Sequence, residues 1–331
     1  MPLLPDSGAS IDLSPRAKII LRGPDRTRYL QGQITNDLAR LDPGQTIEAC
    51  LCNAKGKLEA HVFVREITFP IPNAPGKSET VYLIDAHPDL ANDDFLLNRL
   101  DKYLIADDCE LADATNDFHL LHLIPPPETP PQPKAPDDTF SFHATRFGLP
   151  GIDLLANSLH DTISPPPNLP VLTDERAAAL RIIHGTPTWG RELNPDILPP
   201  EAGPDFIERN ISYTKGCYIG QETISRLKSV GRVNKQLAAL ITPHPPSETP
   251  PSPGWNLFPE SDPESKPVGT LTSTALHPGL NTTIALAFVK TAHLTPGTRL
   301  LAAPPGTNPQ ISPCETVEIR ETPIRQKGNI P

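Results

Sequence analysis

Proline is concentrated in three runs, and these runs limit what the chain can fold into. They span residues 125–136 (PPPETPPQPKAP), 165–170 and 243–267. Proline cannot donate a backbone hydrogen bond, so such a run does not continue a helix or a central strand. The 43 prolines make up about 13% of the chain, against roughly 5% in average proteins. Regular structure is therefore expected between the runs, while the PxxP patterns within them suit either rigid surface loops or docking of a polyproline-binding partner.

Before the first run, strands and helices alternate in an α+β manner. Strands are predicted at 17–21, 47–52, 58–67 and 81–85, and the turn Asn53-Ala54-Lys55-Gly56 joins the second to the third as a hairpin. Helical spacing of apolar residues predicts one helix from Asp25 to the stop at Pro43-Gly44 and another over 90–104. The first helix is indicated by Tyr29, Leu30, Ile34, Leu38 and Leu41.

The rest of the chain predicts one more helix and a β-rich tail. Thr173 is placed to cap a helix that runs to about Gly185, with Asp174 and Glu175 in its first turn. Short β-like runs follow the third proline run, at 268–272, 283–289 and 317–319, and predict a small β-barrel or sandwich. A length of 331 residues suits two or three domains.

Charge and hydropathy exclude several classes of partner. The net charge of −10 argues against general affinity for nucleic-acid backbones, so no direct nucleic-acid binding is expected. No stretch approaches the roughly 18 apolar residues of a membrane span, and the first residues lack a signal-peptide pattern. A cytoplasmic protein with no membrane contact is expected.

The cysteines favour free thiols over disulfides. There are five, an odd number scattered along the chain. Cys50 and Cys52 lie two apart in a predicted strand and share a face, but two ligands do not complete a zinc or iron–sulfur site. We therefore expect packed strand thiols there and no resident metal site.

The segment YTKGCYIGQETISRLKSVGR, residues 213–232, carries the strongest chemical signal. Gly216 and Gly220 bracket Cys217 and predict a tight backbone path, with the thiol just before a helix that begins near Gly220. A helix N-terminus and nearby cations favour a thiolate, and Lys215, Arg226 and Lys228 are close in sequence. A reactive Cys217 is therefore one interpretation, and a small buried filler is the other.

Neighbouring residues supply candidate binding groups. Gln221 and Glu222 either orient a ligand or simply suit the first turn of the helix. The irregular segment TWGRELNPDILPPEAG, residues 188–203, adds four more side chains: Trp189, Arg191, Glu192 and Glu201. Trp189 either stacks on a flat heterocycle or packs between domains. A cysteine hydrolase would need a histidine paired with Cys217, and no local signature pairs one.

The pattern KGCYIGQE, with Tyr218 inside it and Arg226 after it, resembles the signature of the YgfZ family of folate-binding iron–sulfur cluster proteins. The resemblance covers most of the chain, through GPDRTRYLQGQITNDLARLDPG, NAKGKL, LRIIHGTPTWGREL, VGTLTS and IALAFV. It implies an α+β fold like glycine-cleavage aminomethyltransferase (the T-protein), with three domains around a central tetrahydrofolate cavity. The implied division is a discontinuous first domain (1–50 plus 146–234), an α+β second domain (51–145) and a C-terminal β-barrel domain (235–331).

The resemblance also implies site residues. Cys217 falls on the signature cysteine and, with Lys215, would carry the chemistry. The expected folate contacts are Asn36, Asp37, Asn53, Trp189, Arg191 and Glu192. Related chains often have an acidic or amide residue where this one has Ile183-His184, so His184 either replaces that contact or is structural. The transferase places a catalytic aspartate shortly after the hairpin turn, and that position falls here at about Ala60, beside Glu59 and His61.

Three hypotheses follow. The first is a tetrahydrofolate-binding accessory protein for iron–sulfur cluster assembly or repair, whose clients include tRNA-modifying enzymes and which contacts a cluster only transiently, if at all. The second is a folate-dependent aminomethyl or one-carbon transferase, against which the methyl group of Ala60 counts because it cannot stabilise a developing charge. The third is a non-catalytic scaffold. Any cluster would need ligands from a partner, because one cysteine cannot hold it.

Overall fold

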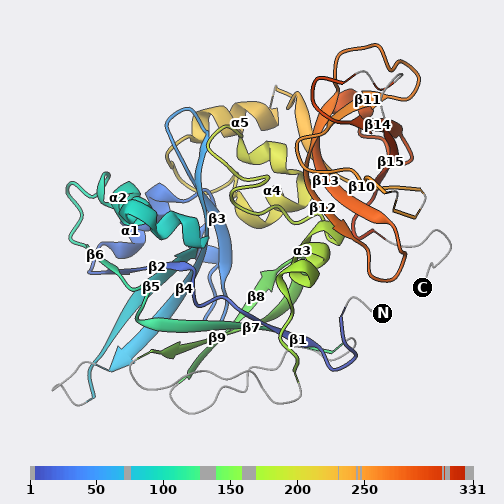
Figure 1. The fold of residues 1–331 in the computed structure, drawn as a ribbon. Helices are drawn as coiled ribbons and strands as arrows, with labels where there is room; N and C mark the ends of the chain where they lie inside the picture. Colours follow the sequence, from blue (N-terminus) through green and yellow to red (C-terminus); the bar gives the residue numbers. More distant parts are fainter. Residues whose placement is uncertain are drawn as a thin grey trace.

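The computed structural model describes residues 4–70, 76–126, 139–158, 169–229, 231–243, 245–246, 248–307, 309 and 314–324. Most of the first two proline runs, with their PxxP patterns, lies outside these residues. Within them, two antiparallel sheets form one part of the molecule and a closed β-barrel forms another, with helices between (Figure 1).

The larger sheet has five strands in the order β3-β4-β5-β2-β6. The strands are β2 (Ala17–Arg22), β3 (Ile47–Cys52), β4 (Leu58–Pro70), β5 (Ser78–Ala86) and β6 (Glu110–Asp113). One face packs against α1 (Arg26–Gln33) and α2 (Phe95–Asp101) through an apolar cluster that includes Leu30, Val62 and Leu96. The predicted hairpin is confirmed, since β3 pairs with β4 antiparallel around the 53–56 turn.

The smaller sheet has four strands in the order β1-β7-β9-β8. They are β1 (Ala9–Asp12), β7 (Phe118–Ile124), β8 (Thr139–Arg146) and β9 (Leu149–Asn157). Residues of both sheets share one buried cluster, in which Ile67 and Leu83 meet Phe118 and Leu155. The two sheets therefore pack face to face.

The C-terminal barrel closes in the order β10-β13-β12-β11-β14-β15. Its strands are β10 (Lys235–Ile241), β11 (Asn256–Pro259), β12 (Gly269–Leu276), β13 (Thr283–Lys290), β14 (Arg299–Ala303) and β15 (Glu315–Arg320). The predicted barrel is confirmed. However, β10 precedes the third proline run, and β11 lies inside it. The segment NLFP can form this strand because its one proline is the last strand residue. The expectation that this run holds no regular structure is wrong.

Helices join the barrel to the sheets. α3 (Asp174–Ile183) contacts β1 residues through Leu180 and barrel residues through Ile182, and Thr173 caps it by accepting from Arg176 N as predicted. α4 (Pro204–Asn210) and α5 (Gln221–Ser229) belong to the segment that packs on the β3–β4 hairpin. Four short 3₁₀ turns complete the assignment, at Leu38–Arg40 (η1), Pro88–Asp94 (η2), Pro199–Ala202 (η3) and Thr291–His293 (η4).

Both predicted helices of the first block are shorter than expected. α1 ends at Gln33, because Ile34 is extended and bridges to Leu51 of β3. The second prediction, 90–104, begins as 3₁₀ structure, and Asp93 and Asp94 have φ of +52°, so the α-helix starts only at Phe95. The helical spacing of apolar residues extends beyond the observed helices. The Ile34–Leu51 bridge ends α1, and the positive φ of Asp93 and Asp94 delays the start of α2.

The division into 1–50 plus 146–234, 51–145 and 235–331 remains a prediction. The expected boundary at residue 50 falls within β3, which pairs with β4, and β8, which ends at Arg146, pairs with β9. Each sheet therefore draws on both sides of an expected boundary.

Candidate functional site

The loop before α5 is fixed along the end of α1. Ser212 N donates to Thr35 O at 3.0 Å and Ile219 N donates to Gly32 O at 3.2 Å. Between them, the Lys215 Nζ donates to the carbonyl oxygens of Gln31 (2.7 Å), Ile34 (2.8 Å) and Asn36 (2.6 Å). Burial lowers the pKa of Lys215 to about 8. This lysine therefore holds the loop to one carbonyl in the last turn of α1 and to two in the residues just after it.

Cys217 is exposed while its neighbour Tyr218 is buried. Tyr218 packs with Cys50, Cys52 and Leu58 of the hairpin, and burial raises the pKa of its hydroxyl. The interpretation of Cys217 as a buried filler is therefore wrong. The loop presents the thiol to solvent between two inward anchors, Lys215 and Tyr218.

The cations expected to activate the thiol have other partners. The charge of Lys215 is directed at the α1 carbonyls described above. Arg226 Nη2 lies 2.7 Å from Glu222 Oε1 on the exposed side of α5, and the Lys228 Nζ lies 3.9 Å from the Tyr213 ring centroid. The predicted role of Lys215 thus has a structural alternative, that of an anchor.

Gly220 and the hairpin turn are in direct contact. Gly220 has φ of +85°, and a Cβ there would lie 2.7 Å from Asn53 O. Asn53 Oδ1 accepts from the backbone N–H groups of Lys55 and Lys57, which closes the turn. Gly216, in contrast, has open space around it and no left-handed backbone. Only the second glycine of the motif is required by packing, and it joins two predicted regions, the 53–56 turn and the start of α5.

Asn36 and Asp37 lie near the loop but are bonded internally. Asn36 Nδ2 donates to Glu48 O and Arg209 O, both at 2.7 Å, and its Oδ1 accepts from Asp37 N. Asp37 Oδ1 accepts from Ala39 N and from Gln31 Nε2. Their predicted folate contact stays a prediction, and Asn36 would have to give up bonds to make it.

Glu192 is completely buried and connects three parts of the molecule. Its carboxylate lies 3.0 Å from Arg181 Nη1 of α3 and accepts from Thr188 N (3.1 Å) and from Thr272 Oγ1 of β12 (2.8 Å). Ser273 Oγ donates to it as well. Arg191, next to it, is exposed, and Glu201 Oε2 accepts from Leu198 N at the start of η3. Glu192 and Glu201 are thus engaged in holding the chain together.

A cavity of about 270 Å³ lies where the two sheets and the 186–189 segment meet. Trp189 lines it and is the only one of the predicted folate contacts that does. Phe63 of β4 and Phe147 of the β8–β9 turn add aromatic surface. The structure therefore separates the predicted residues into two places, with Trp189 in the cavity and Cys217 on the surface loop.

A charged group on the cavity wall was missed by the sequence reasoning. Glu48 Oε2 lies 3.3 Å from His61 Nε2, and Glu48 Oε1 lies 2.9 Å from Arg209 Nε. Burial alone would raise the pKa of Glu48, but the hydrogen bond to His61 and the charge of Arg209 lower it. The alternation of β4 is the signal that could have found this group, because His61 and Phe63 must share a face.

Ala60 has the opposite orientation. It is fully buried in the apolar cluster beneath α1 and α2, whereas its neighbour His61 faces the cavity. Glu59 forms an ion pair with Arg99 of α2. No carboxylate therefore stands at the position where the transferase aspartate was expected.

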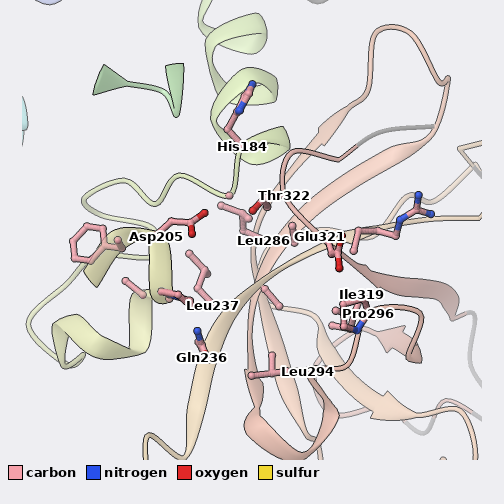
Figure 2. Close-up of a pocket in the computed structure, with 18 of the residues that line it drawn as sticks. His184, Asp205, Gln236, Leu237, Leu286, Leu294, Pro296, Ile319, Glu321 and Thr322 are labelled. Carbon is pink, nitrogen blue, oxygen red and sulfur yellow. The ribbon is translucent and has the colours of Figure 1, made fainter. Parts of the chain in front are cut away.

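His184 lines a different pocket, of about 460 Å³, between the end of α3, the start of α4 and strands β10 and β15 (Figure 2). Asp205, Gln236 and Thr322 surround the same space, and Leu237 and Leu286 contribute apolar surface (Figure 2). His184 therefore lies outside the cavity that Trp189 lines. Both predicted roles, ligand contact and structural residue, remain open for it.

The cysteines are free, as predicted. Burial raises the pKa of the Cys50 thiol and raises that of Cys52 to about 12, which suits packed thiols. The described part of the chain contains no group of three or more His, Cys, Asp or Glu side chains arranged to hold a metal ion. Within those same residues, no helix combines the length and apolar character of a membrane span.

Comparisons of sequence point to one group of proteins. No family model matches the chain. The tRNA-modifying protein YgfZ of Sodalis glossinidius is 28% identical over 255 residues, covering 72% of this chain and 73% of the relative. The YgfZ protein of Yersinia enterocolitica is 27% identical over 246 residues, 69% of each chain. A mitochondrial iron-sulfur cluster assembly factor, the IBA57 homolog of Dictyostelium discoideum, is 23% identical over 270 residues, 70% of this chain and 62% of the relative.

The fold comparison gives a second, independent result. The crystal structure of the glycine cleavage system aminomethyltransferase T from Bartonella henselae matches with a TM-score of 0.70 and covers 96% of this chain and 87% of its own. The sequence identity is 17%, so this match concerns the fold alone. Together the matches confirm the resemblance read from KGCYIGQE and the aminomethyltransferase-like α+β fold with its C-terminal β-barrel.

Proposed function

Because the chain resembles the YgfZ proteins in sequence and aminomethyltransferase T in fold, we propose that it is a tetrahydrofolate-binding accessory protein for iron–sulfur cluster assembly or repair. Its clients would include tRNA-modifying enzymes, and it would act in the cytoplasm. The cluster belongs to the client, and this chain contributes a single thiol to the encounter.

The observation that carries the proposal is the presentation of Cys217. The thiol is exposed, whereas Lys215 and Tyr218 on either side of it are buried and bonded or packed. A thiol on a fixed loop can meet a partner without the entropic cost of ordering that loop. This suits contact with a client protein, a cluster or a one-carbon adduct better than it suits a structural role.

The lining of the cavity beside Trp189 has chemistry that suits a folate. Small-molecule sites are mostly apolar clefts with a few converging polar groups. Here the indole of Trp189 offers a surface on which a flat ring can stack. One lining residue, Thr186, also carries a buried Oγ1 that makes no hydrogen bond to any described residue, and His61 of the Glu48 pair faces the same space. When bound, tetrahydrofolate would supply its one-carbon chemistry, and Trp189, His61 and Thr186 would bind and orient its rings.

A true aminomethyltransferase has less support. The position expected for its catalytic aspartate is Ala60, which lies in the apolar core and away from the cavity. Two acids line the cavity, Asp12 of β1 and Glu48 of β3, and Glu48 is already paired with His61 and Arg209. Turnover of an aminomethyl donor with tetrahydrofolate would distinguish the two functions, and the accessory role predicts none.

A complementation experiment tests the cysteine. In cells lacking this protein, thiolation of tRNA by an iron–sulfur enzyme is measured after expression of the wild type, Cys217→Ser or Cys109→Ser. Cys109 is a partly buried thiol outside the signature loop and serves as the matched control. The wild type and Cys109→Ser are expected to restore thiolation, and Cys217→Ser is not. Equal restoration by all three would remove Cys217 from the mechanism.

A further inference from the structure

An ionic cluster beside the cavity that Trp189 lines, called the central cavity below, contains more positive than negative charge. The cations are Arg16, Arg65 and Arg146, and the anions are Asp85 and Asp153. Arg146 Nη2 lies 2.9 Å from Asp85 Oδ2 and 2.7 Å from Asp153 Oδ2. Arg65 pairs with both aspartates, and Arg16 pairs with Asp85. Both aspartates are therefore shared among the arginines, and one cation is left uncompensated.

Two further charges lie near the cluster, Lys18 and Asp12, and they offset each other, so the excess of one cation remains. The Lys18 Nζ, next to the cluster, donates only to the carbonyl oxygens of Ser14, Arg16 and Thr115. His122 Nδ1 lies 2.8 Å from Asp153 Oδ1, and burial lowers the pKa of this histidine, which favours its neutral form. Uncompensated charge in a protein interior is costly, and an opposite charge removes much of that cost.

The cluster is open to the cavity on one side. Arg16, Arg146 and Phe63 all line the cavity, and the two guanidinium carbons lie 5.1 and 4.0 Å from the Phe63 ring centroid. Arg16 pairs with Asp85 through Nε, its terminal nitrogens have no hydrogen bond to any described residue, and its side chain keeps 13% exposure. A planar guanidinium with free terminal N–H groups suits a carboxylate or phosphate.

The other charged groups of the cavity wall are already balanced. Arg181 pairs with Glu192, and Arg209 pairs with Glu48. Asp12 also lies at the wall, where it accepts from Ser14 N, and its negative charge acts on Lys18. The excess positive charge is therefore local to the Arg16 and Arg146 side of the cavity.

We propose that Arg16 and Arg146 form an anion subsite in the central cavity, which takes a carboxylate of the ligand and so determines which end of a folate faces the sheets. The inference rests on the proposed folate function. In this arrangement, the p-aminobenzoyl-glutamate end lies against Arg16 and the ring system lies toward Trp189. A neutral ligand of the same shape would leave the excess charge uncompensated.

Binding of p-aminobenzoyl-glutamate and of its dimethyl ester, measured by calorimetry, tests the subsite on the wild-type protein without any substitution. The diacid is expected to bind at least about tenfold more tightly than the ester, as for a hydrogen bond between charged groups. Equal affinities would overturn the proposal. Inorganic phosphate that competes with the diacid would support the subsite and show that it also accepts a free anion.

Variants then assign the effect to Arg16. Arg16→Gln is expected to weaken diacid binding by on the order of tenfold to a hundredfold and to leave ester binding unchanged, while Arg16→Lys loses less. Arg28→Gln, an exposed arginine paired with Asp25 and Asp107, is the control and is expected to bind like the wild type. Unchanged diacid binding by Arg16→Gln would contradict the subsite.

The outcomes separate this inference from the proposed function. If 5-formyltetrahydrofolate binds wild type and Arg16→Gln equally, folate binding stands and the anion subsite fails. If the diacid binds in an Arg16-dependent way but no folate binds, the subsite stands and the folate assignment fails. If none of these probes binds, both fail.

Discussion

The C-terminal barrel and the interface between the two sheets have interiors of opposite character. The barrel encloses an apolar cluster that includes Leu240, Leu257, Val289 and Ile319. The sheet interface has an apolar part too, but beside it arginines and aspartates are buried to 0–4% exposure at Arg65, Asp85, Arg146 and Asp153. Both interiors are largely buried, but only the sheet interface contains charge.

This difference indicates what each region is for. Apolar burial stabilises a fold at no electrostatic cost, whereas a buried ion pair often contributes no more than a hydrophobic replacement would. Charge that is expensive to bury is retained here beside a cavity, where a ligand can use it. The barrel interior therefore contributes stability alone, whereas the sheet interface has the charge that the proposed anion subsite requires.

The largest predicted effect comes from breaking the ionic cluster. Asp153→Asn removes a charge shared by Arg65 and Arg146 and should lower the free energy of unfolding by about 3–5 kcal/mol. Leu257→Ala, at a fully buried barrel position, should cost about 2–5 kcal/mol through the cavity that it leaves. Urea unfolding at pH 7 measures both. A loss below about 1 kcal/mol for Asp153→Asn would contradict the account of the cluster.

Acid distinguishes the two variants even if their costs at pH 7 are similar. Burial alone would raise the pKa of Asp153, but Arg146 and Arg65 hold it well below its usual range, and the pKa of Asp85 is lowered in the same way. Stability from these carboxylates is complete above the pKa of an unfolded aspartate, about 3.9, and is lost as pH falls toward the lowered folded values. Between pH 6 and 3, the wild type and Leu257→Ala should lose stability in parallel and Asp153→Asn less steeply. Parallel slopes for all three would refute the assignment.

A smaller effect is expected where the two regions join. Glu192→Gln keeps the size of the side chain but removes the charge that faces Arg181 and the acceptor shared by Thr272 and Ser273. The cost should be about 1.5–3 kcal/mol, the range for hydrogen bonds to charged groups. Because Glu192 ties β12 to α3, limited proteolysis should also cut between sheets and barrel faster than in the wild type. Unchanged cleavage would show that apolar contacts alone hold the junction.

The smallest contrast lies within the signature loop. Gly220→Ala should destabilise the protein by about 1–3 kcal/mol, because φ is +85° and the added Cβ would lie 2.7 Å from Asn53 O. Gly216→Ala should stay within about 0.5 kcal/mol, since nothing lies within 4 Å of its added Cβ. Thermal unfolding of the two variants compares them. Equal shifts would show that the Asn53 contact does not position the loop.

The sequence was sufficient to predict those features that depend on short-range residue patterns. The β3–β4 hairpin, the Thr173 cap and the barrel strands around 268–272, 283–289 and 317–319 depend on spacing and turn residues, and all appear in the structure. The signature KGCYIGQE indicated the family resemblance, which similarity to the YgfZ proteins confirms. The chemical role of Cys217 in that signature remains a prediction.

The features that could not be predicted from the sequence depend on contacts between residues far apart in the chain. The end of α1 is determined by the bridge between Ile34 and Leu51. The Lys215 Nζ donates to carbonyl oxygens of residues about 180 positions earlier in the chain. The ionic cluster draws one aspartate from each sheet, Asp85 from β5 and Asp153 from β9, so no local motif announces it. The cavity wall follows from the same pairing, which is why Trp189 was predicted without Arg16, His61 or Thr186.

The measurement that tests the central claim most directly is the thermal midpoint of wild type and Cys217→Ala, with and without excess tetrahydrofolate under reducing conditions. A ligand that binds only the folded state at about 100 times its Kd adds roughly 2.7 kcal/mol to the free energy of unfolding. We predict equal upward shifts for both proteins, because the proposed folate cavity and the exposed thiol are separate sites. No shift in either protein at saturating ligand would contradict folate binding and favour a scaffold without it.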